Sequence, residues 1–279
     1  MKRRNSITIA VPASMVAEIA NLRDKTTVLG QLGRAAAIYR LDQIIIYREE
    51  PDESLLMKYI LGYLETPQYL RKHLFDVRPE LQFAGILPPL RTPHHPLEEK
   101  LSQVDVGEFR DGVVLGGSGY NYRVDVGLDV PMNVRGKPPV KGSRISTEIM
   151  QVEPEFSGRS VKKKDIPEYW GYDLRGHKRR LSDLVYSPEW DLTIATSRTG
   201  DMIGSVKVKL EADWAEADKT LIVFGSYKEG VGEIITREGR RAEEVFNYIV
   251  NTIPGQGTAT VRTEEAVVST LAIFNIFKE

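Results

Sequence analysis

Cysteine is absent from this sequence, and histidine is scarce. Without thiols the chain can form no disulfide bond, no zinc–thiolate site and no cysteine nucleophile, a composition that fits a reducing compartment. The four histidines are His73, His94, His95 and His177, and their spacing matches no metal-binding motif. We therefore expect the protein to bind no metal.

Long apolar runs and a large net charge are also missing. No apolar run approaches the roughly 18 residues that span a membrane. The apolar stretch after the basic segment 1–5 is too short for a signal peptide. The formal net charge is −1 at pH 7, so any contact with nucleic acid has to depend on local basic patches. We expect a cytoplasmic protein that does not contact a membrane.

Two nucleotide-binding motifs are missing as well. No Gly-x-Gly-x-x-Gly follows the first apolar strand, and no glycine-rich loop ends in Gly-Lys-Ser or Gly-Lys-Thr. These motifs hold the phosphates of dinucleotides and of nucleoside triphosphates. Their absence argues against a nicotinamide-dependent oxidoreductase and against an NTPase.

The two ends of the chain alternate strands and helices. Apolar patterning predicts strands over residues 6–11 and 44–47, and again over 191–196 and 219–224. Apolar residues at helical spacing predict helices in the first part of the chain, over residues 12–23, 26–39, 52–64 and 68–74. This alternation is typical of an α/β fold with an open parallel sheet.

The middle of the chain has a different pattern. Residues 86–96 are rich in proline, and short β-type runs follow at 111–117, 122–127 and 142–147. Closely spaced turns between alternating runs predict a small antiparallel barrel. We therefore expect residues 1–85 and 176–279 to be the two halves of one α/β domain, and residues 86–175 to be an inserted barrel.

Three apolar runs in the last part of the chain are followed by loops of small and polar residues, at 197–201, 225–230 and 251–258. Ligands of open α/β sheets bind at the carboxyl ends of the strands, so we expect these loops to line one pocket. The last loop leads into a predicted helix over 266–277. Thr263 is its expected N-cap, and Val267, Leu271 and Phe274 form its apolar face.

The last loop also carries a family resemblance. Residues 251–257 (Asn-Thr-Ile-Pro-Gly-Gln-Gly), followed by Arg-Thr-Glu-Glu-Ala and a helix, resemble the final cofactor loop and closing helix of the SPOUT superfamily of RNA methyltransferases. Within it, the sequence looks like the archaeal and eukaryotic branch of RNA uridine N3-methyltransferases, which carries an inserted barrel. Residues 30–34 (Gly-Gln-Leu-Gly-Arg) are similar to the first motif of the superfamily.

This resemblance covers nearly the whole chain and implies an enzyme that uses S-adenosyl-L-methionine to methylate uridine N3 in rRNA or another structured RNA. It also implies a C-terminal trefoil knot, an OB-like barrel and a homodimer. Methyl transfer from a sulfonium requires alignment and proton removal but no metal. The resemblance assigns cofactor binding to Thr196, Ser197, Arg198, Gly225, Ser226, Gly230, Asn251, Thr252, Ile253, Gly255, Gln256, Gly257 and Thr258.

Four residues are candidates for catalysis. Arg34 matches an arginine that faces the reaction centre in the ribose-methylating branch. Otherwise Gly30 and Gly33 would serve helix packing, and Arg34 would be a surface charge. Glu264 or Glu265 could remove the N3 proton, although acids in the first turn of a helix are also explained by the helix dipole. Arg262 could hold the RNA.

The segment 135–144 contains four basic residues and no acid. We expect Arg135, Lys137, Lys141 and Arg144 to contact RNA phosphates, although solvated loop charge is the simpler explanation of any one basic cluster. Two further basic clusters lie at 159–164 and 175–180. Two other functions stay open: an RNA ribose 2′-O-methyltransferase, and a non-catalytic RNA-binding or assembly factor with the same fold.

Overall fold

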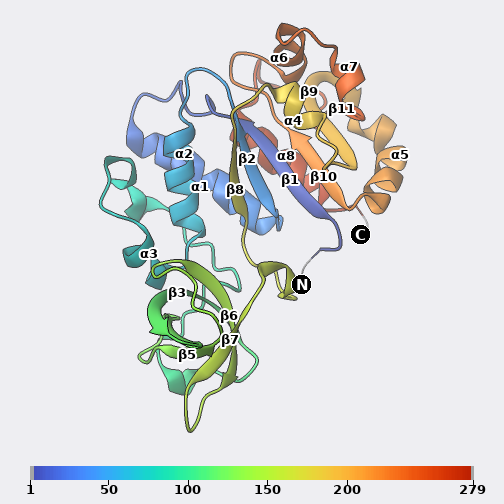
Figure 1. Cartoon of the computed structure of the whole chain (residues 1–279). Coiled ribbons are helices and arrows are strands. Elements are labelled where there is room, and N and C mark those ends of the chain that lie inside the picture. The colour runs from blue at the N-terminus through green and yellow to red at the C-terminus, as the bar shows by residue number, and fades with distance from the viewer. Residues whose placement is uncertain (1–2, 278–279) are drawn as a thin grey trace. The chain divides into compact units, whose positions relative to one another are not determined.

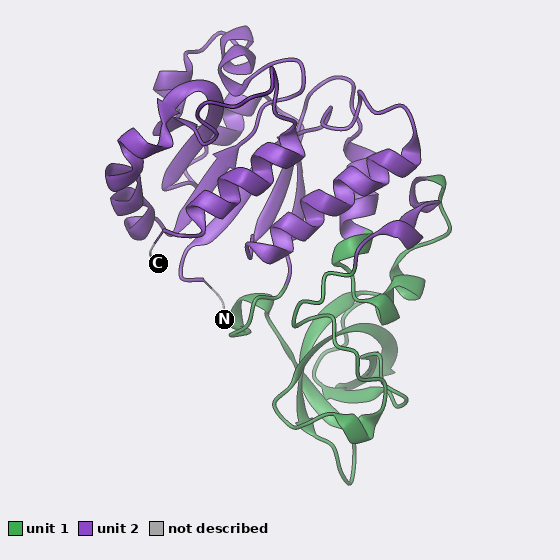
Figure 2. Cartoon of the chain, turned by 180° about the vertical axis from the view of Figure 1, so that it is seen from behind, with its two compact units in different colours: residues 1–2, 63–79, 89–170 green, residues 3–62, 80–88, 171–279 purple. Residues whose placement is uncertain are grey.

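The structure of the chain is a computed structural model that describes residues 3–277, so Met1 and Lys2 of the basic N-terminal segment lie outside the described residues. The described chain forms two compact units (Figure 2). The first contains residues 63–79 and 89–170. The second contains residues 3–62, 80–88 and 171–277.

A six-stranded parallel sheet is the centre of the second unit (Figure 1), in the order β11-β9-β10-β1-β2-β8. Its strands are β1 (Ser6–Pro12), β2 (Gln43–Tyr47), β8 (Asp173–His177), β9 (Leu192–Met202), β10 (Lys219–Val223) and β11 (Tyr248–Asn251). The inner strands are almost continuously buried, as expected of a parallel sheet covered on both faces. The predicted α/β class with a parallel sheet is therefore confirmed.

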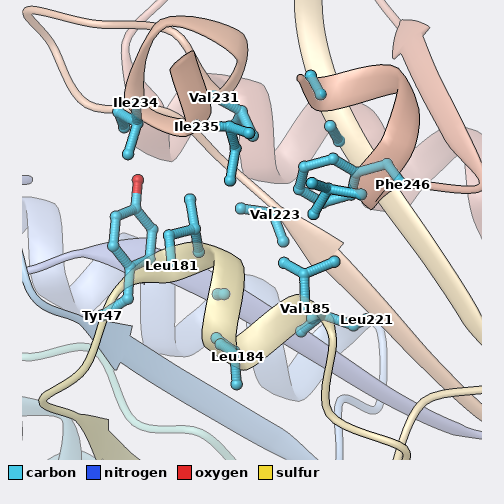
Figure 3. Close-up of a cluster of buried hydrophobic side chains, with 14 of the residues drawn as sticks. Tyr47, Leu181, Leu184, Val185, Leu221, Val223, Val231, Ile234, Ile235 and Phe246 are labelled. Carbon is cyan, nitrogen blue, oxygen red and sulfur yellow. The ribbon is translucent and has the colours of Figure 1, made fainter. Parts of the chain in front are cut away.

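Helices cover this sheet on both sides. Helices α1 (Leu22–Ile38) and α8 (Thr263–Phe274) pack against each other on one face (Figure 2). The other layer is formed by three short helices, α4 (Leu181–Val185), α6 (Val231–Arg237) and α7 (Ala242–Val245). Their apolar residues form a core with Leu221 and Val223 of β10 (Figure 3). Of the other α-helices within residues 3–277, α5 (Ile203–Glu216) and most of α2 (Ser54–Glu65) belong to the second unit, and α3 (Gln68–Leu74) belongs to the first.

The first unit contains a closed barrel of five strands in the ring order β3-β4-β5-β7-β6. The strands are β3 (Phe109–Ser118), β4 (Asn121–Asp125), β5 (Met132–Arg135), β6 (Arg144–Gln151) and β7 (Ser157–Val161). Its interior is a cluster of apolar side chains that includes Val114, Val124 and Met132. Because β5 pairs with β7 in parallel, the sheet is mixed rather than wholly antiparallel as predicted.

Two predicted local structures are wrong. Residues 13–18 form turns instead of a helix, because the backbone of Ala13 bonds across to Tyr47 at the end of β2 and to Glu53 in the loop that follows β2. Thr263 is not the N-cap of the last helix but its first residue, and Arg262 is the N-cap. The predicted apolar face of this helix is confirmed, because Val267, Leu271 and Phe274 are all buried.

Candidate functional site

The three predicted loops leave neighbouring strands of the sheet. Strands β11, β9 and β10 are adjacent and parallel, so their carboxyl ends lie at the same edge of the sheet. The first of the loops is part of β9 by its backbone conformation. Ile249 pairs with Ala195 and Val250 with Asp201, so residues 196–200 bulge out of the ladder between β9 and β11.

Hydrogen bonds join this bulge to the last loop. The side-chain amide of Asn251 donates to the backbone oxygen of Arg198 at 2.8 Å. The guanidinium of Arg198 in turn donates to the backbone oxygen of Ala259 at 2.9 Å. Arg198 in the bulge is thus bonded to the beginning and to the end of the last loop, although the two segments are more than fifty residues apart in sequence.

The middle loop is bonded to the first residue of α8, and β10, the strand before this loop, is bonded to the bulge. The hydroxyl of Thr263 donates to the backbone oxygen of Gly225 at 3.1 Å, and the hydroxyl of Thr196 donates to that of Val223 at 3.0 Å. Gly225 is required by close packing, since a Cβ atom there would lie 2.9 Å from the backbone oxygen of Glu229. The structure therefore brings all three loops together.

The last loop presents many unused donors. Its start is anchored inside the unit, where the hydroxyl groups of Thr252 and Thr270 are 2.8 Å apart. Within the described part of the chain, the backbone N–H groups from Gly255 to Val261 make no hydrogen bond to the protein. A Cβ atom at Gly255 or at Gly257 would meet no other atom within 4 Å. The loop thus has exposed polar backbone beside open space.

Glu264 lies where this loop enters α8, next to Thr263. It is only 8% exposed. Burial raises the pKa of its carboxyl group above the usual value, and the negative charges of Glu265 and Glu18 add to that rise, although Arg262 partly opposes it. Arg262 itself is exposed. Glu18 was not a sequence candidate, because it reaches this place only through the turns that follow β1.

The structure does not bring Arg34 to the same edge. Helix α1 begins after the carboxyl end of β1 and ends near the amino end of the same strand. Asp42, which follows the helix, accepts a hydrogen bond there from the backbone N–H of Ile7 at 2.9 Å. Arg34 lies in the last turns of α1, roughly 18 Å along the helix from its first residue. Within one chain it is therefore separate from the three loops.

The four predicted RNA contacts fall into two groups. Arg135, Lys137 and Lys141 are exposed on the barrel. Arg144 is instead bound to two buried carboxylates: its Nη1 is 2.6 Å from Glu65 Oε2, and its Nε donates to Asp111 Oδ2 at 3.0 Å. Because these carboxylates neutralise its charge, the prediction that Arg144 contacts RNA is not supported by its environment.

The network around Arg144 was not foreseen from the sequence. Burial alone would raise the pKa of Glu65, but a hydrogen bond from His94 and the charge of Arg144 lower it to about 2. Asp111 also accepts the indole N–H of Trp170 at 2.8 Å. These partners are far apart in sequence, so no local pattern could have revealed them.

Among residues 3–277, no group of three or more histidine, aspartate or glutamate side chains is placed to hold a metal ion. No helix in that range is long and apolar enough to cross a bilayer.

Comparison with known proteins gives a consistent result. A family model described as "Putative RNA methyltransferase" matches residues 6–274. An uncharacterized protein of Halobacterium salinarum is 31% identical, covering 94% of this chain and 96% of its own. The human 28S rRNA (uridine-N(3))-methyltransferase is 30% identical, and the match covers 97% of this chain and 78% of the human protein. The Drosophila melanogaster protein of the same name is also 30% identical, and the match covers 96% of this chain and 61% of that protein.

A match from residue 6 to residue 274 takes in the sheet, the barrel and all three loops. Methyl transfer requires a bound methyl donor, and the joined loops offer one place at which such a donor could be held. The chain belongs to this family of RNA methyltransferases, which are methyl-transferring enzymes.

Proposed function

We propose that this protein uses S-adenosyl-L-methionine to methylate a uridine base at N3 in RNA. The observation that carries the proposal is the joining of residues 196–200, 225–230 and 251–263 by hydrogen bonds at one edge of the sheet. The names of the human and Drosophila relatives support the choice of uridine N3 as the target.

The last loop fits an adenosine-containing cofactor. Its backbone N–H groups from Gly255 to Val261 lack protein partners, and the space beside Gly257 is open. Neutral donors and acceptors of this kind match a nucleoside, whose base and ribose present several hydrogen-bonding groups. When bound, S-adenosyl-L-methionine supplies an electrophilic methyl group.

The chain's own groups then bind the RNA and move a proton. Glu264 is buried beside the loop, and its raised pKa makes its carboxylate a better proton acceptor than an ordinary glutamate. We assign it removal of the proton from uridine N3. Arg262, the N-cap two residues before Glu264, is exposed and would hold the RNA backbone or the target base.

The remaining features implied by the resemblance are part of the same proposal. They are membership of the SPOUT superfamily, a trefoil knot in the C-terminal segment, an OB-like barrel and a homodimer. The five-stranded ring is compatible with an OB-like barrel. Val268 on α8 and Ile276 in the turn that follows the helix are apolar and 41% and 65% exposed, which supports a second copy packing on this end of the chain's last helix.

Two measurements test the proposal. Calorimetry with S-adenosyl-L-methionine should give saturable binding to the full chain. Mass spectrometry of nucleosides from total RNA, incubated with the protein and labelled cofactor, should show labelled 3-methyluridine.

The results would also separate the alternatives. Label in a ribose methyl group would identify a 2′-O-methyltransferase instead. No cofactor binding, together with retained RNA binding, would identify a non-catalytic RNA-binding protein.

A further inference from the structure

The outer surface of the barrel carries a basic face that the sequence alone does not reveal. Side chains alternate along β4 and β5, so that Tyr122, Val124, Met132 and Val134 are buried while the residues between them point outward. On β7, Gly158 faces inward, because a Cβ atom there would lie 2.5 Å from Met132 Sδ. We call the outward surface of these strands the β4-β5-β7 face; it includes Asn121, Arg123 and Asp125 of β4, Asn133 and Arg135 of β5, and Ser157 and Arg159 of β7.

Strand pairing aligns these residues across three neighbouring strands. Asn121 lies opposite Arg135, and Arg123 lies opposite Asn133. Asn133 in turn lies opposite Ser157 on β7. Adjacent strands are about 4.8 Å apart. Arginines from segments separated in sequence therefore gather on one surface together with amide and hydroxyl groups.

The charge of this face is only partly neutralised by the protein. Arg159 pairs with Glu148 at 2.6 Å, but its side chain remains 62% exposed. Arg123 and Arg135 are exposed, and neither makes an ion pair with a described residue. Two nearby acids have other partners. Asp125 Oδ2 is 3.0 Å from His73 Nε2. Glu155 Oε1 accepts a hydrogen bond from the side-chain amide of Asn133 at 2.8 Å. Clustered, unpaired guanidinium groups favour a polyanion.

An aromatic side chain stands at one end of this face. Tyr120 is 66% exposed in the tight turn between β3 and β4, where Gly119 has a φ of +62°. The turn is fixed to the neighbouring strand, because the backbone N–H of Gly136 donates to the backbone oxygen of Tyr120 at 2.9 Å. Tyr120 is therefore held beside Arg135 and Lys137, which flank Gly136.

We infer that the β4-β5-β7 face and Tyr120 bind single-stranded RNA, with the arginines contacting phosphates and Tyr120 stacking on an unpaired base. Exposed aromatic rings beside basic grooves bind single strands in this way, because the faces of bases within a duplex are already stacked. The inference rests on the proposed function in taking RNA as the partner. It narrows that partner to an unpaired segment held by the barrel.

The test measures RNA affinity directly, with no methyl transfer involved. The probe is an oligouridylate of about twelve nucleotides, within the site sizes typical of such barrels, compared with a duplex of the same length formed with oligoadenylate. The full chain should bind the single strand more tightly than the duplex. Tyr120→Ala should weaken single-strand binding by about 5- to 150-fold, while Tyr120→Phe retains it.

The arginines are tested by salt dependence. The triple variant Arg123→Gln, Arg135→Gln and Arg159→Gln should lower the slope of log K against log salt by about 2, since each lost phosphate contact on a single strand removes about 0.7. The matched control replaces three exposed basic residues of the same unit that lie off these strands, Lys72→Gln, Arg91→Gln and Lys100→Gln. It should change the slope less. Thermal unfolding of every variant checks that the barrel is intact.

The possible outcomes distinguish the two proposals. If both Tyr120→Ala and the triple arginine variant bind oligouridylate as the wild type does, or if the duplex binds as tightly as the single strand, the inference is overturned. Binding that depends on this face in a protein that never methylates RNA would support the inference and overturn the proposed function alone.

Discussion

At the scale of single residues, the surroundings of a charged side chain decide its role. Arg144 belongs to a basic segment of the sequence, yet it is enclosed by Glu65 and Asp111. Burial alone would lower the pKa of its guanidinium, but the two carboxylates raise it above the usual value. Lys141, three residues away, is exposed. The two residues are equivalent in the sequence and differ only in the folded chain.

This difference predicts unequal effects on stability. Arg144→Ala would leave two buried carboxylates without their cation, and we expect it to lower the free energy of unfolding by about 3–5 kcal/mol. Lys141→Ala should change it by less than about 0.5 kcal/mol. Urea unfolding followed by tryptophan fluorescence measures both, because Trp170 bonds to the same Asp111. Equal stability of the two variants, with weaker RNA binding only for Arg144→Ala, would restore Arg144 as an RNA contact.

Removing the carboxylate of Glu264 should stabilise the folded protein while lowering its catalytic rate. Because its pKa is raised in the folded state, ionising this group opposes folding: the stability it contributes is present at low pH and is lost as the pH rises through its folded pKa. Glu264→Gln should therefore be at least as stable as the wild type at pH 7.5, with the difference shrinking toward pH 4. It should lower kcat by about 100-fold or more, because general-base catalysis is lost.

Two measurements check this prediction, thermal unfolding against pH and a pH–rate profile. In the wild type the acid limb of kcat/KM should lie above the pH expected of an ordinary glutamate. Glu216→Gln is the control, because Glu216 is exposed on α5 and is not among the groups that shift the pKa of Glu264. Unchanged turnover in Glu264→Gln would remove Glu264 from the proposed mechanism.

At the scale of elements, the strand-end loops are positioned by the sheet and shaped by glycine. Gly255 has a φ of +69°, in the left-handed region that favours glycine, and its role is therefore in the backbone of the turn. Gly257 does not have a positive φ, so a side chain there would not strain the backbone. It would only occupy the open space beside the loop.

Gly257→Val therefore separates ligand binding from folding. The valine side chain would fill the open space beside the last loop, so cofactor binding measured by calorimetry should be lost. The free energy of unfolding should stay within about 0.5 kcal/mol of the wild type. Gly204→Val in α5 is the matched control, since a Cβ atom there also meets nothing within 4 Å. Retained cofactor binding in Gly257→Val would count against the proposed cradle.

At the scale of the whole molecule, the proposed homodimer predicts a particle of about twice the 31.5 kDa of one chain. If α8 and the turn after it form the contact, Val268→Glu together with Ile276→Glu should give a monomer in sedimentation equilibrium, because buried unpaired carboxylates oppose association. Val208→Glu on α5 is the control, since Val208 is 86% exposed on a helix outside the proposed contact. A wild-type mass of one chain at every concentration would refute the dimer.

The sequence by itself determined much of the local structure and marked the three strand-end loops that the structure joins. Apolar patterning correctly predicted β1, β2, β10 and the buried face of α8, since side chains two or four residues apart share a face whatever the rest of the chain does. Glycine and small polar residues after three strands marked the loops, because these residues favour turns through their own local backbone preferences.

Only the tertiary structure decided which distant groups meet. The bond from Arg198 to Ala259, the enclosure of Arg144 by Glu65 and Asp111, and the gathering of Arg123 with Arg135 depend on strand order and register. Turns at residues 13–18 replaced a predicted helix, and the backbone of Ala13 at their start bonds to Tyr47 of β2 and to Glu53 in the loop that follows it. Long-range pairing is set by the packing of the complete core, which no window of sequence contains.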